Sequence, residues 1–363
     1  MDESGADQAA GTLASSTEFS RYDQVQKADY HLAEAADDED AFDEDFEFTT
    51  CDLAQYLHGS EADRDAFSQQ LGDAMSEIGF AILTGHGVDT GIYDDAIEWV
   101  EQFFTTQPMD AKLARRAERH GAVSEGYFPV HETSDIHPDL VEGWVFGRRA
   151  FDLDDDPDFD PAPFWHDPSF EPRFRRLVEA ELPLFKPIMS SVLRYFDCDP
   201  GLYDDQLTRP NFGLRLNWYP PMSADDQGRR AGRLLGHEDI DLFTLLPAPE
   251  VEGLQVLSRE GKWIRLNAPS GSIVLNTGDY MARITNDVLP STTHRVSPPR
   301  DPRQGALGRV SFPLAAYLRP DEVLEVLPTI PQPKYDPIKV VTFHTRTTAK
   351  FYGDDYAVED PVS

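Results

Sequence analysis

The N-terminal half of the chain has the hydrophobic spacing of helices. Apolar residues recur every three or four positions over residues 63–78 and again over 90–105, which predicts two amphipathic helices. A longer helix is predicted over residues 174–195, where Pro183 and Pro187 should kink or divide it. Helices are therefore expected to dominate the first part of the chain.

The spacing of apolar residues changes to a period of two near Leu214. Alternation over residues 214–219 predicts a strand, and further short strands follow between glycine, proline and asparagine residues. The predicted strands span residues 80–83, 214–219, 241–246, 254–258, 264–266, 272–276, 293–296 and 309–317. Short strands separated in this way are typical of an all-β sandwich or barrel. We expect a mainly β fold with flanking helices.

These patterns divide the chain into four segments. Residues 1–45 are polar and acidic, and we expect a largely disordered tail there. Residues 46–363 are expected to form a single domain, with a helical part over 46–210 and a β core over about 211–320. In the remaining extension, 321–363, a helix is expected to cover the mouth of the barrel. Its candidate residues are Phe343, Thr347, Lys350 and Phe351.

Composition narrows the classes of partner. The 363-residue chain has 66 acidic and only 32 basic residues, which gives a formal net charge of −34. Because there is no basic stripe to contact phosphates, we expect no nucleic acid partner. A surface so rich in carboxylates suits a protein in concentrated salt, which screens the self-repulsion. An acidic enzyme adapted to ordinary salt is the alternative explanation.

Membrane segments, secretion signals and disulfides are not expected. No run of apolar residues is long enough to span a membrane, and the acidic N-terminus has no apolar signal segment. The two cysteines, Cys51 and Cys198, do not make a disulfide framework. The simplest interpretation is a reduced, cytoplasmic protein that acts on a small molecule, and its oligomeric state is left open.

His237, Asp239 and His294 carry the clearest chemistry in the chain. Residues i and i+2 of a strand point to the same face, so His237 and Asp239 can bind one ion between them. His294 lies far enough along the chain to return on a neighbouring strand. Two imidazoles and one carboxylate on one side of an octahedron form the facial triad of non-haem Fe(II) oxygenases, which leaves three positions open.

A series of short motifs surrounds this triad. The motifs are residues 79–88 (GFAILTGHGV), 218–221 (WYPP), 253–256 (GLQV), Trp263, 278–279 (GD), 285–286 (TN), 291–296 (STTHRV) and 309–312 (RVSF). In this order, from about Phe46 to the C-terminus, the chain resembles the isopenicillin N synthase-like branch of the Fe(II)/2-oxoglutarate-dependent oxygenases. The resemblance implies a double-stranded β-helix, or jelly roll, framed by N-terminal helices.

The resemblance also implies cofactors and residues that bind them. Fe(II), the cosubstrate 2-oxoglutarate and O₂ would be required. In the family an Arg-x-Ser pair binds the distal carboxylate of 2-oxoglutarate, and Arg309 and Ser311 match that pair. An Asn-x-Tyr-Pro segment of the family lies beside the iron and the cosubstrate, and Asn217 and Tyr219 match it.

Arg215 is a candidate substrate-binding residue. Alternation places Arg215, Asn217 and Tyr219 on one face of the same strand, pointing into the barrel. A guanidinium inside a barrel is unfavourable unless it is paired. Arg215 therefore either meets a buried carboxylate or binds an anionic substrate, and the sequence favours neither alternative.

Other polar residues within or near the motifs are expected to be structural. His86 is predicted to be a turn histidine and Asp279 a turn residue rather than a second carboxylate ligand. Arg295, adjacent in sequence to a candidate ligand, should not share the face of that ligand. His344 has no ligand-like company and is predicted to be an ordinary surface or core residue.

Three functional classes fit these observations. The leading prediction is a 2-oxoglutarate-dependent oxygenase that hydroxylates, desaturates or cyclises a small anionic molecule. The second is an Fe(II) oxidase or oxidative cyclase of the same fold that does not use 2-oxoglutarate. Isopenicillin N synthase is such an enzyme and has the Arg-x-Ser pair, so Arg309 and Ser311 do not separate these two classes. The third is a jelly-roll protein that binds metal without turnover.

Overall fold

The structure, a computed structural model, describes residues 41–130, 140–153, 160–165, 167–222, 233–300, 302–352 and 356–362. Most of the predicted tail, residues 1–40, lies outside these ranges. The acidic composition also predicts a tail over residues 41–45, but Phe42 forms a β-bridge with Trp263. The ring centroid of Phe42 lies 3.6 Å from the Arg265 guanidinium. A basic partner that is distant in sequence therefore holds the end of the acidic segment against the domain.

The longer N-terminal helices lie close to their predicted positions. The helices of this part are α1 (Leu53–His58), α2 (Glu61–Ile78), α3 (Gly91–Thr106), α4 (Met109–Leu113), α5 (Glu171–Glu181), α6 (Phe185–Tyr195) and α7 (Asp204–Thr208). Helix α2 begins earlier than predicted because Ser60 and Asp63 form a capping box, and it ends at Gly79, whose φ is 73°. The third predicted helix is divided by a 3₁₀ turn at Pro183, whereas Pro187 is tolerated in the first turn of α6.

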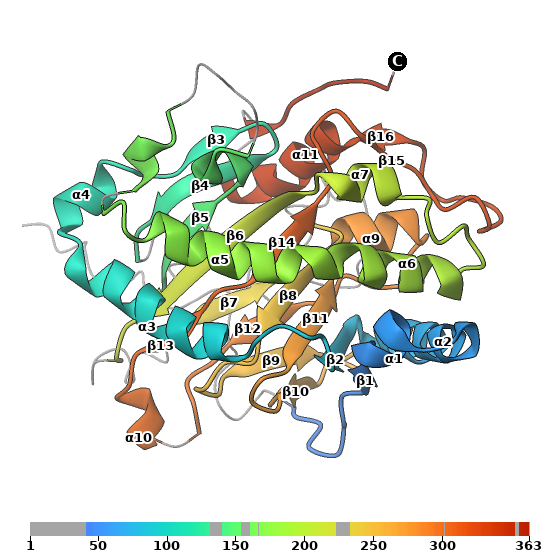
Figure 1. Ribbon diagram of the computed structural model, residues 1–363, viewed down its shortest axis with the longest axis horizontal. Coiled ribbons are helices and arrows are strands. Elements are labelled where there is room, and N and C mark those ends of the chain that lie inside the picture. The colour runs from blue at the N-terminus through green and yellow to red at the C-terminus, as the bar shows by residue number, and fades with distance from the viewer. Residues whose placement is uncertain are drawn as a thin grey trace, which may run out of the picture.

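The main sheet combines the N-terminal strands with half of the β core. Its order is β1-β2-β11-β8-β14-β6-β5-β4-β3, and β13 also pairs with β6. Its strands are β1 (Thr50–Asp52), β2 (Phe80–Thr84), β3 (Glu118–His120), β4 (Val123–Phe128), β5 (Glu142–Phe146), β6 (Asn211–Tyr219), β8 (Phe243–Pro247), β11 (Ile273–Thr277), β13 (Arg309–Ser311) and β14 (Leu314–Tyr317). Helices α5 and α6 run across one face of this sheet (Figure 1).

A smaller sheet completes the jelly roll. Its order is β10-β9-β12-β7, and its strands are β7 (Leu234–His237), β9 (Leu254–Leu257), β10 (Trp263–Arg265) and β12 (His294–Val296). The predicted strand over 309–317 is two strands, β13 and β14, which both pair with β6. Pro313 lies between them and has no N–H to donate, while its carbonyl accepts from the Arg215 amide at 3.0 Å. The two sheets enclose a cavity lined by residues of both.

Aromatic side chains fill the layer between the helices and the main sheet. Phe103 of α3 has its ring centroid 5.0 Å from that of Trp144 and 5.7 Å from that of Phe174, both in edge-to-face geometry. All three side chains are completely buried. Edge-to-face pairs of this kind contribute beyond their buried area, so the helices hold the sheet, and the cavity behind it, in place.

The C-terminal extension supplies the predicted helix, rotated from its expected orientation. The remaining elements are α9 (Asp279–Ile284), α10 (Pro302–Gly305), β15 (Val323–Leu324), β16 (Ile338–Lys339) and α11 (Val340–Tyr352). His344 and Thr348 of α11 line the cavity, whereas Phe343 and Thr347 pack into the core. Successive helix residues point about 100° apart, and the residues that line the cavity each follow a predicted residue by one position. The other two candidates have side chains outside the described structure, and no described helix could span a membrane.

Candidate metal and cosubstrate site

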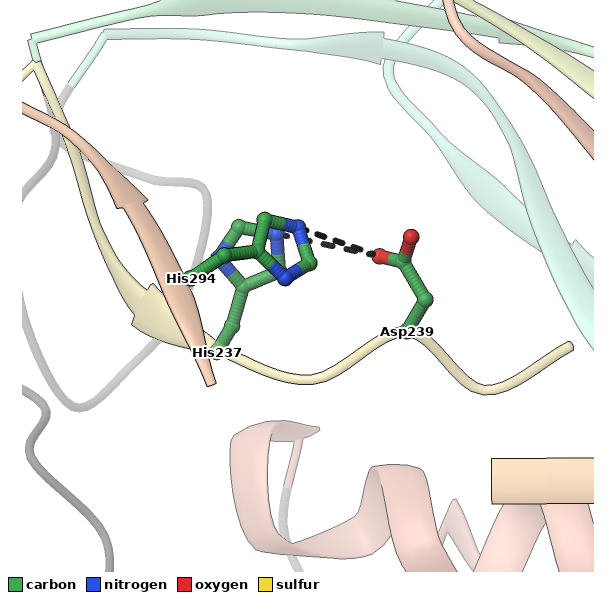
Figure 2. Close-up of side chains that lie close together, drawn as sticks. All are labelled: His237, Asp239 and His294. Atoms are coloured by element: carbon green, nitrogen blue, oxygen red, sulfur yellow. Dashed lines mark ion pairs between the residues drawn. The ribbon is translucent and has the colours of Figure 1, made fainter. Parts of the chain in front are cut away.

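The three candidate metal ligands meet where β7 and β12 lie side by side. β7 ends at His237, β12 begins at His294, and these two residues are paired across the strands. Asp239 was predicted to share the strand of His237, but it lies two residues beyond the strand end, in the loop that follows (Figure 2). Its Oδ1 lies 3.8 Å from Nε2 of His237 and 3.9 Å from Nε2 of His294. The three side chains therefore converge on one point where an ion can bind.

The Asp239 carboxylate is held by its second oxygen. Thr244 donates to Oδ2 at 2.7 Å and the Asn276 amide donates to the same oxygen at 2.8 Å. Thr244 on β8 and Asn276 on β11 are direct cross-strand partners, so the main sheet itself forms this clamp. Oδ1 is left to face the two imidazoles. Burial acts to raise the pKa of Asp239, but His294, His237 and the two hydrogen bonds outweigh burial and lower it.

A second buried acid continues this network. The Thr244 hydroxyl also lies 2.6 Å from Oδ2 of Asp241, although a hydroxyl has only one proton to donate. Burial raises the pKa of Asp241 well above its usual range, and the Asp239 carboxylate adds to that effect. The consistent arrangement is that neutral Asp241 donates to Thr244 and Thr244 donates to the charged Asp239. The ligand carboxylate is thereby oriented by a chain of hydrogen bonds.

His294 is oriented through the ring nitrogen that faces away from the triad. Nδ1 lies 3.1 Å from the carbonyl oxygen of Thr292, which can only accept, so Nδ1 carries the proton. Nε2, which faces Asp239, is left with a lone pair for a metal ion. Neutral imidazoles and a carboxylate are ligands that suit Fe(II). The donor set thus fits the iron that the resemblance implies.

A Thr244→Val substitution tests the clamp on Asp239. The valine has the same shape but cannot donate, so the carboxylate can rotate and the divalent metal should bind roughly 10- to 100-fold more weakly. The measurement is Co(II) affinity by competition with a chelator. Thr347→Val is the matched control, because Thr347 is equally buried and donates only within its own helix. Equal metal affinity in wild type and Thr244→Val would show that the clamp has no role in metal binding.

The triad opens into the cavity between the two sheets. This cavity has a volume of about 280 Å³ and reaches from the three convergent side chains to Arg309 and Ser311. The register of β13 on β6 places Arg309 opposite Tyr219 and Ser311 opposite Asn217. The Asn217 amide donates to Ser311 Oγ at 3.2 Å. The four candidate cosubstrate residues therefore form one cluster on the cavity wall.

Arg309 is buried but has hydrogen-bonding capacity left over. Its side chain is almost inaccessible. Nε donates to the carbonyl of Val251 at 3.1 Å, and within the part of the chain that the structure describes Nη1 has no hydrogen-bond partner. Its guanidinium lies 4.8 Å from the centroid of the Tyr219 ring. Burial lowers the pKa of Arg309, and interaction with Tyr219 partly offsets this. A buried cation in this state is stabilised by an anion, which a dicarboxylate ligand would supply.

Arg215 lines the same cavity on the face that alternation predicted. Its Nε donates to Oδ1 of Asn217 at 2.9 Å, and its guanidinium lies 5.5 Å from the Phe128 ring centroid. Among the described residues, no carboxylate lies within ion-pair distance of Arg215. Arg215 therefore does not form the structural ion pair that the sequence left open, within the described part of the chain.

His344 is a cavity residue that the sequence did not indicate. It is almost fully buried on α11, and its Nδ1 lies 2.7 Å from the Tyr280 hydroxyl. Burial lowers the pKa of His344 to about 3, so the ring is neutral and belongs to a polar network beside the metal loop. A single histidine in a polar C-terminal segment carries no signal of this position, which depends on how α11 docks.

The other polar residues that the sequence analysis considered have structural roles. Nε2 of His86 lies 2.9 Å from the carbonyl of Gly271, which ties the turn after β2 to the loop before β11. Arg295 points away from the triad and stacks on Trp263, with its guanidinium 3.7 Å from the ring centroid. Asp279 is not a turn residue as predicted but the first residue of helix α9. It is fully buried and not part of the ligand cluster, and its backbone N–H donates to the carbonyl of Asp239 at 2.8 Å.

Known proteins are similar to this chain in sequence and in fold. Residues 49–168 match the family described as the N-terminal region of non-haem dioxygenase in morphine synthesis. Residues 205–314 match the 2-oxoglutarate-Fe(II) oxygenase superfamily. The 2-oxoglutarate-Fe(II) type oxidoreductase ppzC of Metarhizium majus is 30% identical over 336 residues, covering 83% of this chain and 86% of the relative. The proline hydroxylase buaE of Petromyces alliaceus is 28% identical over 262 residues, covering 69% and 80%.

A solved structure has the same architecture. A Neurospora crassa protein in complex with alpha-KG and thymine superposes with a TM-score of 0.74 at 22% identity, covering 84% of this chain and 97% of that one. A jelly roll around a convergent His-Asp-His cluster defines a mononuclear non-haem metal protein. The chain belongs to the 2-oxoglutarate-Fe(II) oxygenase superfamily. It is an oxidoreductase of that family, whose members use Fe(II), 2-oxoglutarate and O₂.

Proposed function

We propose that the protein is a 2-oxoglutarate-dependent Fe(II) oxygenase that hydroxylates, desaturates or cyclises a small anionic molecule. His237, Asp239 and His294 would hold the iron, and the four clustered residues Arg309, Ser311, Tyr219 and Asn217 would hold 2-oxoglutarate. One observation supports the proposal above the rest. The convergent triad and a buried arginine with unused donors lie on the wall of a single cavity.

The bound iron would supply the redox chemistry, in which O₂, 2-oxoglutarate and the primary substrate give succinate, CO₂ and the oxidised product. The protein supplies orientation and exclusion of water. Arg309, charged and planar, can bind a carboxylate through two parallel hydrogen bonds and so fixes the far end of the cosubstrate. Ser311 is held in place by the Asn217 amide. Phe80, whose ring centroid lies 5.4 Å from that of His294, places apolar surface beside the metal ligands and would help to exclude water there.

The cavity supports a small substrate with an anionic group. A volume of about 280 Å³ shared with a dicarboxylate leaves room for a compact molecule only. Arg215 provides a cation without a carboxylate partner among the described residues, and Phe128 and Val145 provide apolar surface beside it. One relative is named a proline hydroxylase, and proline is a small molecule that bears a carboxylate. A small carboxylic acid is therefore the proposed substrate class.

An Arg215→Leu substitution tests the substrate half of this proposal. Candidate acids are scored by how far they stimulate succinate release over the substrate-free rate. In the variant we expect the substrate-free rate to persist and the stimulation to fall by roughly 10- to 100-fold, because a charged hydrogen bond to the substrate is lost. Arg173→Leu is the control, since Arg173 stacks on Phe170 in the helical layer, away from the cavity.

The same variant separates the two roles considered for Arg215. If it instead neutralised a buried carboxylate, Arg215→Leu would destabilise the fold by about 3–5 kcal/mol. Thermal unfolding measures this directly. An unstable variant that keeps full stimulation by the acids would remove Arg215 from the substrate site.

A further inference from the structure

Arg233 is a second deeply buried arginine close to the proposed cosubstrate site. It precedes β7 directly, its side chain is 0% exposed, and its backbone N–H donates to the carbonyl of Val296 at 3.1 Å. Nη2 donates to the carbonyl of Leu307 at 3.0 Å, whereas Nε and Nη1 have no hydrogen-bond partner among the described residues. A single carbonyl satisfies only part of this guanidinium.

Arg233 and Arg309 form a pair of like charges at the same end of the barrel. The carbonyl that Arg233 contacts, that of Leu307, lies two residues before Arg309 in the chain. Burial lowers the pKa of Arg233 to about 10, and the charge of Arg309 adds a smaller effect in the same direction. Tyr219 offsets this lowering only in part. In the described part of the chain, neither arginine has a carboxylate within ion-pair distance. Two buried cations that influence one another thus have no anionic partner among the described residues.

Such an arrangement is unfavourable in a protein without ligand. Each charge loses its hydration on burial, and the two repel one another in a medium of low dielectric constant. A dianionic ligand reverses both effects, because its carboxylate attracts both guanidinium groups. Both positive charges would thus act on the place where the distal carboxylate of the cosubstrate is proposed to lie.

We propose that Arg233 is a positioning residue for the dicarboxylate cosubstrate, whose buried charge reinforces that of Arg309 on the distal carboxylate. Arg233 does not line the cavity, so it acts on the ligand through the electrostatic potential and through Arg309 rather than by contact. The inference rests on the proposed function of the site and adds a residue to it. The competing role is purely structural, in which Arg233 serves only to bond the Leu307 carbonyl.

The test is calorimetric binding of 2-oxoglutarate to the Co(II)-loaded protein, with three variants. Arg233→Gln keeps a donor for the Leu307 carbonyl but removes the charge, and it should weaken binding by roughly 10-fold. Arg233→Lys keeps the charge and should bind within about threefold of wild type. Arg295→Gln is the control, because Arg295 is also buried but stacks on Trp263 away from the cavity. The affinity of this variant for 2-oxoglutarate should not change.

Thermal unfolding with and without 2-oxoglutarate provides a second readout. Removal of one of two like charges should leave the ligand-free melting temperature of Arg233→Gln unchanged or higher, while the increase on adding 2-oxoglutarate shrinks. A structural role predicts the opposite pattern: a lower melting temperature in both states and wild-type affinity.

The outcomes separate this inference from the function on which it rests. If wild type binds 2-oxoglutarate and Arg233→Gln binds it equally well, Arg233 has no role in cosubstrate binding. If Arg233→Gln does not fold, Arg233→Lys provides the test. A loss of 2-oxoglutarate affinity in Arg233→Lys as large as the loss in Arg309→Lys would likewise overturn the inference, because the charge at position 233 would then not be enough to maintain binding. A wild-type protein without affinity for 2-oxoglutarate would overturn the proposed function, and this inference with it.

Discussion

Replacing Asp239 with alanine is expected to abolish iron-dependent turnover and to weaken divalent-metal binding by more than roughly 100-fold. This loss exceeds the one expected when a residue that only hydrogen-bonds to a metal ligand is removed. Asp239 supplies the only carboxylate in the convergent cluster of the described residues, and its Oδ1 faces both imidazoles. Two histidines alone leave the ion with too few ligands and with no negative charge to offset its own. Chelator competition with Co(II) gives the affinity, and succinate release gives the turnover.

Glu238 provides a matched control for this prediction. It is the adjacent acid in the chain, but its Oε1 accepts a hydrogen bond from Thr293 and it is not part of the convergent cluster. Glu238→Gln should therefore bind Co(II) with nearly wild-type affinity. The metal assignment is wrong if Asp239→Ala and Glu238→Gln have the same metal affinity, or if the loss appears only in the glutamate variant.

An Arg309→Lys substitution is expected to weaken 2-oxoglutarate binding by roughly 10- to 100-fold, the equivalent of one charged hydrogen bond. The ammonium keeps the charge but cannot offer two parallel donors to a carboxylate. The Nε bond to Val251 is also lost, so the head group is no longer held against the wall. Calorimetry on the Co(II)-loaded protein measures the affinity without turnover.

Arg295→Lys is the control for the arginine change itself. Arg295 is as buried as Arg309, but it stacks on Trp263 and donates to Gln255 at 2.8 Å, outside the cavity. We expect this variant to lose stability and to retain 2-oxoglutarate affinity. Unchanged affinity in Arg309→Lys would argue that the arginine has a structural role and that the protein resembles the oxidases that do not use 2-oxoglutarate.

Local patterns predicted the elements that are held together mainly by their own sequence. The helical period marks α2 and α3, and Pro183 marks the division between α5 and α6 because proline acts on its own helix. Strands β4 and β5 were missed, since the segment over Val123–Phe128 includes polar residues and glycine. These strands are stabilised by pairing with β6 and with each other, which no local pattern reveals.

The candidate site shows the same limit. The His-x-Asp spacing indicated the metal cluster, although Asp239 reaches it from a loop and not from the strand. The clamp on Asp239 depends on the register that sets Thr244 opposite Asn276, and the sequence contains no sign of that register. Arg233 and His344 were missed for a related reason: each is a polar residue in a segment without a motif, and only tertiary packing buries it beside the site.

Succinate release from 2-oxoglutarate tests the central claim most directly. The protein is loaded with Fe(II) and 2-oxoglutarate without oxygen, and air is then admitted in the absence of any primary substrate. We expect no succinate before the switch, slow formation after it, and none from Asp239→Ala under the same conditions. Absence of succinate from the loaded wild-type protein in air, together with O₂ consumption when a substrate is supplied, would contradict the account and favour an Fe(II) oxidase that does not use 2-oxoglutarate.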